Sequence, residues 1–281
     1  MEIIRTVAEL RRWSRSIRLT TGKTIGLVPT MGALHAGHAS LIRAARSSCG
    51  HVAVSIFVNP TQFGPNEDFS RYPRTFDADC ALAKTEGADV IFAPSVEELY
   101  PPGATTFVEV DDLSHRLDGA SRPGHFRGVA TVVAKLLIAA EPDQAFFGQK
   151  DSAQVVVIRR LATDLCLATE IVVCPIVRDA DGLALSSRNI YLSAEERAQA
   201  LTLSKVICRV EAIVTAGERC STKLFAVARA TFAAVPEIRV DYIELVDSAT
   251  LQPVEKVLPG TLFAVAAWVG ETRLIDNAVL S

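Results

Sequence analysis

Short apolar segments alternate with helical patterns through the first 175 residues, and this alternation constrains the fold more than any other feature of the chain. The apolar segments are hydrophobic along their whole length, which is typical of strands covered on both faces. Strands are expected at Thr24–Pro29, His51–Val58, Asp89–Ala93, Gln144–Phe147 and Glu170–Pro175. Helices are expected at about Gly37–Ser48, Thr75–Glu86, Val129–Ala140 and Asp151–Leu165. This order predicts βαβ units, and therefore an α/β fold with a Rossmann-like parallel sheet.

The pattern changes after Arg178. Asp179–Gly182 is a turn sequence, and Ser193, followed by acidic residues, is typical of the N-terminus of a helix. We expect that helix to run to about Ala216, with a second helix after it. Two strand-like segments then follow, at Ile238–Val246 and Thr261–Val269. These patterns predict a smaller α+β domain, so we divide the chain into domains 1–178 and 179–281.

Charge and hydropathy exclude several classes of protein. Lys and Arg number 29 against 32 Asp and Glu, whereas proteins that bind nucleic acid usually carry a basic excess. The longest apolar stretches are Val52–Val58, Val132–Ala140 and Leu262–Val269. All are shorter than the roughly 20 residues of a membrane-spanning helix. The N-terminal sequence lacks the apolar core of a signal peptide, and the six cysteines form no C-x-x-C pair. We therefore expect a cytoplasmic protein without nucleic-acid or membrane partners.

The first candidate site is the segment PTMGALHAGH, residues Pro29–His38, which follows the first predicted strand. Ligands of open α/β sheets bind where strands end and helices begin, because helix N-termini offer unpaired N–H groups. His35 and His38 are three residues apart and share one face of a helical turn. Two imidazoles there can donate to phosphate oxygens and stabilise charge during nucleotidyl transfer. A lone histidine would favour a structural role, but the pair favours a functional one.

The H-x-G-H part of this segment resembles the signature of the nucleotidyltransferases related to class I aminoacyl-tRNA synthetases. The fuller segment resembles the pantothenate synthetase (pantoate–β-alanine ligase) family, and the resemblance covers nearly the whole chain. It implies ATP-dependent condensation of (R)-pantoate with β-alanine through a pantoyl adenylate, giving pantothenate, AMP and diphosphate for coenzyme A biosynthesis. It also implies Mg²⁺ with the ATP, and a homodimer.

Two further blocks concern the substrate. Asn59 and Gln62, in the segment NPTQ, follow the second predicted strand, and buried amides suit a hydroxy-acid ligand. The bare segment is an ordinary turn, but the resemblance implies that Gln62 contacts both pantoate and β-alanine. Arg122 and His125, in the segment RPGHFRG, are interpreted either as an anion clamp or as a solvated basic loop. The resemblance favours a role near the nucleotide.

Acidic residues open the helix that follows Tyr72, and such residues usually complement the helix dipole. The resemblance implies that Asp79 among them is an outer ligand of Mg²⁺, which commonly uses few protein carboxylates.

The block FGQKDSAQ marks a strand–turn–helix junction. Lys150 can neutralise a phosphate, Asp151 can bind a ribose hydroxyl or cap the helix, and Gln154 lies on the same face. The block matches a family pattern in which Glu commonly stands where this chain has Gln149. Further departures stand at Ser152 and Ala153. We expect these changes to tune nucleotide or substrate affinity, although reduced activity is an alternative.

The last block, Leu185–Asn189, lies at the predicted domain junction, and its hydroxyls and guanidinium can wrap a triphosphate. It occupies the position of the synthetase KMSKS loop, and Gly182 before it would allow the segment to close over ATP. The resemblance implies catalytic roles for His38, His35, Lys150 and Arg188. It implies ATP contacts from Met31, Gly32, Ala33, Leu34, His35, Ala36, Gly37, His38, Gly148, Gln149, Lys150, Asp151, Val177, Leu185, Ser186, Ser187 and Arg188. It implies contacts with pantoate or β-alanine from Gln62, Gln154, Asn59, Tyr72, Arg122 and His125.

Two other functions remain open from the sequence. An adenylyltransferase acting on a phosphorylated acceptor would share H-x-G-H but would not require the other blocks together. A regulatory nucleotide-binding module without turnover would fit the departures in the FGQKDSAQ block. A dehydrogenase is disfavoured, because no G-x-G-x-x-G follows the first predicted strand.

Overall fold

The structure is a computed structural model that describes residues 1–281, and the chain forms two compact units. The first unit comprises Met1–Gly148 and Val157–Pro175, and the second comprises Gln149–Val156 and Ile176–Ser281. The division passes through one helix, α7 (Ser152–Asp164).

The first unit contains a six-stranded parallel sheet with strand order β1-β4-β3-β2-β5-β6. Its strands are β1 (Glu2–Ile4), β2 (Ile25–Thr30), β3 (His51–Ile56), β4 (Val90–Phe92), β5 (Gln144–Gly148) and β6 (Glu170–Cys174). From β2 the chain proceeds through β3 to β4 on one side, and later returns to β5 on the other side of β2. The order of strands therefore reverses between β2 and β5. In sheets of this kind, ligands bind beside such a reversal, at the carboxyl ends of the strands.

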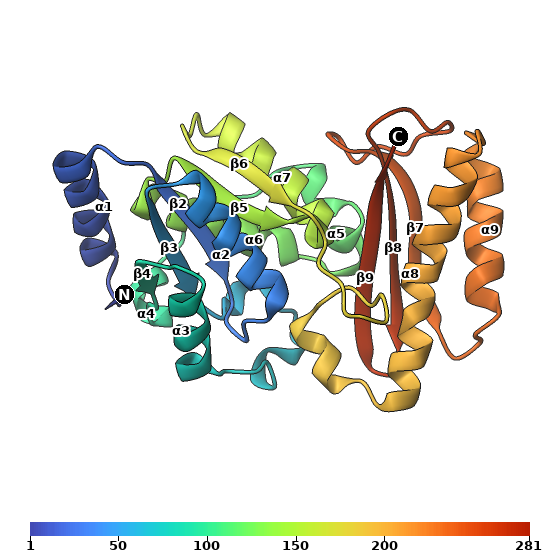
Figure 1. Cartoon of the computed structure of the whole chain (residues 1–281), viewed down its shortest axis with the longest axis horizontal. Helices are drawn as coiled ribbons and strands as arrows, with labels where there is room; N and C mark the ends of the chain where they lie inside the picture. Colours follow the sequence, from blue (N-terminus) through green and yellow to red (C-terminus); the bar gives the residue numbers. More distant parts are fainter. The chain divides into compact units, whose positions relative to one another are not determined.

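Among the helices of this unit, α2 and α6 pack against the strands of the sheet. The helices are α1 (Val7–Thr21), α2 (Ala36–Ser48), α3 (Phe76–Thr85), α4 (Val96–Leu99), α5 (Asp118–Ser121), α6 (His125–Ala140) and most of α7. Short 3-10 helices lie at η1 (Pro60–Gln62), η2 (Asp68–Ser70) and η3 (Leu113–His115). Figure 1 shows α2 lying along β2 and β5, against which it packs. Five of the six β2 residues are buried, so side chains on both faces of this strand are covered, as its apolar sequence predicts.

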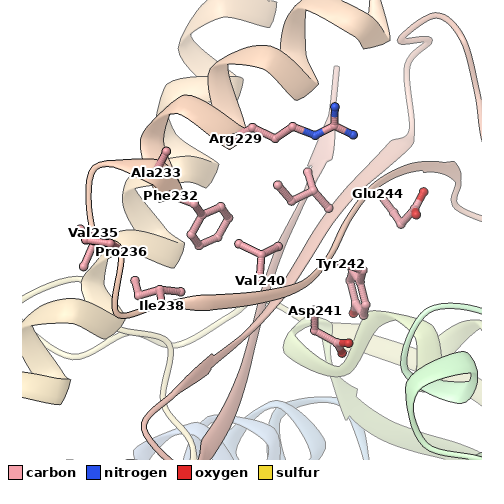
Figure 2. A pocket seen from close by; sticks show the side chains of 11 residues that line it. Arg229, Phe232, Ala233, Val235, Pro236, Ile238, Val240, Asp241, Tyr242 and Glu244 are labelled. Carbon is pink, nitrogen blue, oxygen red and sulfur yellow. The ribbon is translucent and has the colours of Figure 1, made fainter.

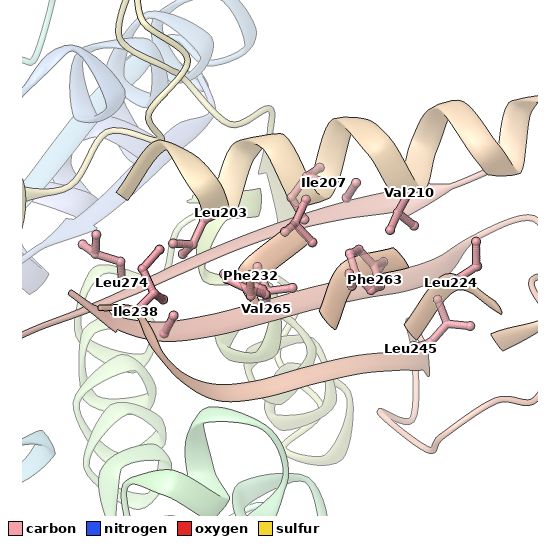
Figure 3. Packing of buried hydrophobic residues seen from close by; sticks show 14 of the residues in the cluster. Leu203, Ile207, Val210, Leu224, Phe232, Ile238, Leu245, Phe263, Val265 and Leu274 are labelled. Carbon is pink, nitrogen blue, oxygen red and sulfur yellow. The ribbon is translucent and has the colours of Figure 1, made fainter. Parts of the chain in front are cut away.

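The second unit is built on an antiparallel sheet of β7 (Arg239–Asp247), β8 (Thr261–Val269) and β9 (Thr272–Leu280), in that order. Helices α8 (Ala194–Thr215) and α9 (Ser221–Ala233) pack against each other and against the sheet. Figure 3 shows the apolar side chains of α8, α9 and the strands meeting in one core. This unit also contains η4 (Gln149–Asp151) and η5 (Ser187–Tyr191). Ser193 begins α8 as predicted, through a capping box in which its side chain accepts from the Glu196 N–H.

The predicted α/β class, with a smaller α+β part, is confirmed. The elements that were not predicted include β1, α1 and β9, and the short helices α4 and α5. The strand β1 has only three residues, α1 buries only Leu10 and Ser14, and β9 interleaves polar residues with apolar ones. Helix α6 begins at His125 rather than near Val129. The division at 178/179 stays a prediction, and no helix of the chain combines the length and apolarity needed to cross a bilayer.

Candidate active site

The predicted site residues fall into two sets, one in each unit. The first unit holds Met31, Gly32, Ala33, Leu34, His35, Ala36, Gly37, His38, Asn59, Gln62, Tyr72, Asp79, Arg122, His125 and Gly148. The second holds Gln149, Lys150, Asp151, Gln154, Val177, Leu185, Ser186, Ser187 and Arg188.

The chain turns sharply between β2 and α2. Gly32 and Ala33 both have positive φ, +82° and +50°. Two successive left-handed residues bring neighbouring backbone N–H groups to the same side of the turn, which makes an anion-binding concavity. The predicted turn and helix start are therefore present, with α2 beginning at Ala36.

Two histidines cap the start of α2. His35 is the N-cap residue, and its Nδ1 accepts from the Gly37 N–H at 3.1 Å. His38 reaches back, and its Nδ1 accepts from the His35 N–H at 3.3 Å. The ring centroids lie 4.2 Å apart. Because each Nδ1 accepts a hydrogen bond, each neutral ring carries its proton on Nε2. The pair thus has two Nε2–H donors at the end of β2.

An acidic residue fills the concavity of the turn. The carboxylate of Asp79 accepts from the Ala33 N–H at 3.0 Å and from the Leu34 N–H at 2.8 Å. Thr75 Oγ1 donates to it at 3.0 Å, and Asp79 is only 3% exposed. The N–H groups of Ala33 and Leu34 are therefore already hydrogen-bonded within the protein. The ATP contacts expected of these two residues would involve their other atoms.

The NPTQ segment lies beside the first motif, because Gln62 Nε2 donates to the Met31 sulfur at 3.0 Å. Asn59 Nδ2 donates to Gln62 Oε1 at 3.1 Å and thereby orients the Gln62 amide. Asn59 Oδ1 accepts from the Tyr100 hydroxyl at 2.9 Å and from the Thr61 hydroxyl at 2.9 Å. With its amide used in this way and only 1% of the residue exposed, Asn59 holds the loop, and its contact with a substrate stays a prediction.

Helix α6 approaches the same loop closely at Gly128. A Cβ at Gly128 would lie 2.3 Å from the Thr61 carbonyl oxygen, so only glycine fits there. The Gly128 carbonyl in turn accepts from Asn59 Nδ2 at 3.1 Å. Gly128 ends the RPGHFRG segment already noted in the sequence, whereas Tyr100 and Glu67 were not identified from the sequence.

The predicted anion clamp is occupied by the protein itself. Arg122 forms two hydrogen bonds with the Glu67 carboxylate, at 2.8 and 2.6 Å. A third nitrogen of Arg122 lies 3.0 Å from His125 Nε2, and His125 Nδ1 lies 2.8 Å from the Gln62 carbonyl oxygen. Burial, aided by the Arg122 charge, lowers the pKa of His125 to about 4. His125 is therefore neutral at pH 7, accepting from Arg122 and donating to Gln62.

This arrangement changes the interpretation of Arg122 and His125. Glu67 neutralises the Arg122 charge, and the Arg127 guanidinium stacks 4.1 Å from the centroid of the Phe107 ring. Part of the segment is nevertheless exposed, at Pro123, Gly124 and Arg127, and the anion clamp stays a prediction. The segment supports the backbone of Gln62. Tyr72 is also buried, with its ring centroid 5.9 Å from that of Phe63.

In the second unit, Lys150 lies in η4, just before α7, and its ammonium is 3.5 Å from the Asp151 carboxylate. The buried Asn277 holds this segment: its Nδ2 donates to the backbone carbonyls of Gln149 and Lys150, at 3.0 and 2.9 Å. Its Oδ1 accepts from Gln149 Nε2 at 2.9 Å. Gln149, the departure from the family pattern, is therefore paired with Asn277. Gln154 lies near the start of the same helix.

The segment at the predicted junction begins with a hairpin. The Leu185 N–H donates to the Val177 carbonyl at 3.0 Å. Arg178 forms a bidentate ion pair with the buried carboxylate of Asp276, at 2.7 and 2.9 Å. Arg197 binds the carboxylates of the turn, Asp179 and Asp181. Ion pairs therefore hold both a strand of the hairpin, at Arg178, and its turn. Ser186 Oγ begins η5 by accepting from the Arg188 N–H at 3.2 Å.

The geometry does not support magnesium binding by Asp79. Both of its oxygens accept backbone N–H groups of the turn, and the predicted role as an outer Mg²⁺ ligand stays a prediction. A cavity of about 520 Å³ lies elsewhere, between α9 and β7 (Figure 2). Its walls combine apolar side chains with Arg229, Asp241 and Glu244, and none of the predicted site residues lines it.

Comparison with known proteins identifies the family. Residues 2–279 match the family model described as pantoate-beta-alanine ligase. A pantothenate synthetase of Acidobacterium capsulatum is 59% identical, with 98% of this chain and 95% of that protein covered. The crystal structure of pantothenate synthetase from Thermus thermophilus has a TM-score of 0.94 and 44% identity, covering 99% of each chain.

A pantoate-beta-alanine ligase from Francisella tularensis, solved in complex with beta-gamma ATP and beta-alanine, has a TM-score of 0.80 and 36% identity. The alignment with it covers 99% of this chain and 97% of that one. By sequence and by fold, over almost its whole length, the chain belongs to the pantoate–β-alanine ligase family.

Proposed function

We propose that this ligase makes pantothenate from pantoate and β-alanine in two steps, through an acyl adenylate. A carboxylate oxygen of pantoate attacks the α-phosphorus of ATP, and the bond from that phosphorus to diphosphate breaks. The amine of β-alanine then attacks the acyl carbon, the bond to AMP breaks, and the amine loses a proton. Activation is needed because a free carboxylate is a poor acyl donor, whereas AMP is a good leaving group.

The observation that carries this proposal is the double histidine cap of α2. Hydrogen bonds from backbone N–H groups hold Nδ1 of His35 and His38, which leaves Nε2 as the protonated nitrogen of each neutral ring. Two Nε2–H groups at a helix N-terminus suit an anion that gains charge during reaction. We assign them to the α-phosphate in its five-coordinate state and to the departing diphosphate.

The other roles follow from chemistry at each residue. Gln62, oriented by Asn59 beside Met31, hydrogen-bonds the hydroxy acid pantoate. Gln154 also binds pantoate, and Asp151 binds the ribose. Lys150 and Arg188 neutralise phosphate oxygens, as a point charge and as a planar donor respectively. The protein contributes mainly positioning and electrostatic stabilisation rather than covalent chemistry.

Magnesium enters this proposal as part of the substrate MgATP, since Asp79 is committed to the turn. We also propose that the enzyme is a homodimer, which light scattering of the purified protein tests. We place it in the cytoplasm, where ATP is made.

The decisive experiment is pantoate-dependent exchange of labelled diphosphate into ATP, with Mg²⁺ present and β-alanine absent. Exchange requires reversible formation of an adenylate, so it identifies both the reaction class and the first substrate. Exchange that depends instead on a phosphorylated acceptor would assign the chain to another adenylyl transfer reaction. ATP binding without any exchange would show that turnover has been lost.

A further inference from the structure

The turn that precedes His35 depends on a carboxylate from another element. Leu34 and Asp79 are 45 residues apart in the chain, and Asp79 lies in the first turn of α3. Its two oxygens each accept one of two successive N–H groups, those of Ala33 and Leu34. The carboxylate is thus the anion that fills the concavity made by the two left-handed residues.

The fit is close on both sides. A Cβ added to Gly32 would lie 3.0 Å from Asp79 Oδ2, so the turn and the carboxylate are packed at contact distance. Thr75, the residue before α3, adds a third hydrogen bond from its hydroxyl at 3.0 Å. Asp79 is 3% exposed, whereas Asp77 in the same helical turn is exposed. The two acidic residues therefore have different roles, although their sequence context is the same.

The consequence for the histidines is direct. Leu34 is bonded to Asp79 through its N–H, and His35 is the next residue. The His35 N–H donates the capping hydrogen bond to His38 Nδ1. The orientation of both rings therefore depends on the position of the His35 backbone at the end of the turn. A displacement of about 1 Å at such a site can reduce a reaction rate about 100-fold.

We propose that Asp79 is a positioning residue, which holds the turn so that His35 and His38 are presented together, and that it is not a magnesium ligand. The inference deepens the proposed function and rests on it for the reaction affected. The structural part, the dependence of both rings on the Asp79 carboxylate, stands independently of that function.

The test uses the full-length Asp79→Asn variant, with Asp77→Asn as the matched control. Asparagine keeps the size of the side chain, but its NH₂ group faces a backbone N–H that needs an acceptor. The first measurement is the set of imidazole ¹⁵N signals of the five histidines. We expect Asp79→Asn to move those of His35 and His38 and to leave those of His51 and His115 in place. Asp77→Asn should move none of them.

The second measurement is diphosphate exchange as a function of Mg²⁺ concentration. We expect the rate at saturating MgATP to fall about 10- to 100-fold, while the Mg²⁺ concentration that gives half-maximal exchange stays that of the parent. A rate restored by high Mg²⁺ would overturn the proposal in favour of a metal ligand. Unchanged imidazole signals would overturn it as well.

If Asp79→Asn does not fold, Thr75→Val provides a milder change, because it removes only the hydroxyl bond to the carboxylate. It should move the same two sets of imidazole signals by a smaller amount, and signals that stay in place would contradict the proposal. If the parent protein shows no exchange, the proposed function fails, but the imidazole signals still decide whether Asp79 positions the rings.

Discussion

The side-chain amide of Asn277 donates to the backbone carbonyl oxygen of Lys150, with 2.9 Å between the two atoms. The same nitrogen donates to the Gln149 carbonyl at 3.0 Å, and Asn277 is only 3% exposed. The last strand of the chain therefore holds the backbone of the segment from which the Lys150 ammonium extends.

Asn277→Ala should lower the rate of diphosphate exchange, because two backbone carbonyls lose their donor and the Lys150 backbone is released. We expect a loss of about 1–3 kcal/mol in the free energy of unfolding and a rate about 10- to 100-fold lower. Denaturant titration and the exchange assay measure the two effects. Val279→Ala, two residues along the same strand at an exposed position, is the control. Parent-like exchange in a destabilised Asn277→Ala protein would show that the amide serves stability alone.

Gln149→Glu should destabilise the protein and alter its dependence on ATP more than its dependence on pantoate. Asn277 Nδ2 donates to two backbone carbonyls, which fixes the orientation of the Asn277 amide. Asn277 Oδ1 therefore faces the side chain of residue 149, and that side chain must donate a hydrogen bond to it. An ionised glutamate cannot donate, whereas a protonated one can. The stability difference from the parent should therefore grow as pH rises through the pKa of the new carboxyl, as thermal unfolding at several pH values would measure. An effect confined to pantoate would place residue 149 in a different pocket.

Acid should destabilise the first unit through His125. Its pKa is lowered from 6.5 to about 4 in the folded protein, so the unfolded chain binds the proton first. The neutral ring contributes up to about 3 kcal/mol to the free energy of unfolding. This contribution is fully present above pH 6.5 and is lost as the pH falls toward about 4. Arg122, Glu67 and Asp118 are the charged groups that act on the ring. Burial alone would raise the pKa of Glu67, but its hydrogen bond with Arg122 lowers it overall, which adds acid sensitivity at lower pH.

His125→Asn is the matched variant for this prediction, because its amide cannot titrate but can still donate to the Gln62 carbonyl. Urea unfolding of both proteins between pH 7.5 and 4.5 should show the parent losing more stability than the variant. A His125 signal that titrates near pH 6.5 in NMR spectra would contradict the prediction.

His38→Asn and His38→Gln should separate the two functions of the His38 ring. The asparagine oxygen can replace Nδ1 as the acceptor of the His35 N–H, but nothing replaces Nε2. The glutamine nitrogen can replace the Nε2–H donor instead. We expect His38→Asn to keep its thermal stability and to lose about 100- to 1,000-fold in the rate of adenylate formation, with a smaller loss in rate for His38→Gln. Near-normal exchange by His38→Asn would remove His38 from the reaction.

The alternation of apolar strands and helices, and the capped start of α8, could be predicted from the sequence because they depend on neighbouring residues. The same is true of the turn at Gly32 and of the histidine pair, since both lie within one short segment. The elements that escaped prediction have weak local signals: β1 is three residues long, and β9 carries polar residues such as Asp276 and Asn277 inside an apolar strand.

The sequence by itself determined the parallel sheet, the H-x-G-H motif after β2 and the family resemblance. All three depend on patterns of neighbouring residues or on motifs that follow one another in a fixed order. Only the tertiary structure decided which side chains support the others. Asp79 binds the turn at Leu34, Glu67 neutralises Arg122, and Asn277 holds Lys150, across 45, 55 and 127 residues respectively. An aspartate or asparagine looks the same in the sequence whether its side chain binds a metal, a substrate or a backbone N–H. The partner of such a side chain is determined by the packing that brings distant segments together, and the spacing of residues in the sequence does not predict it.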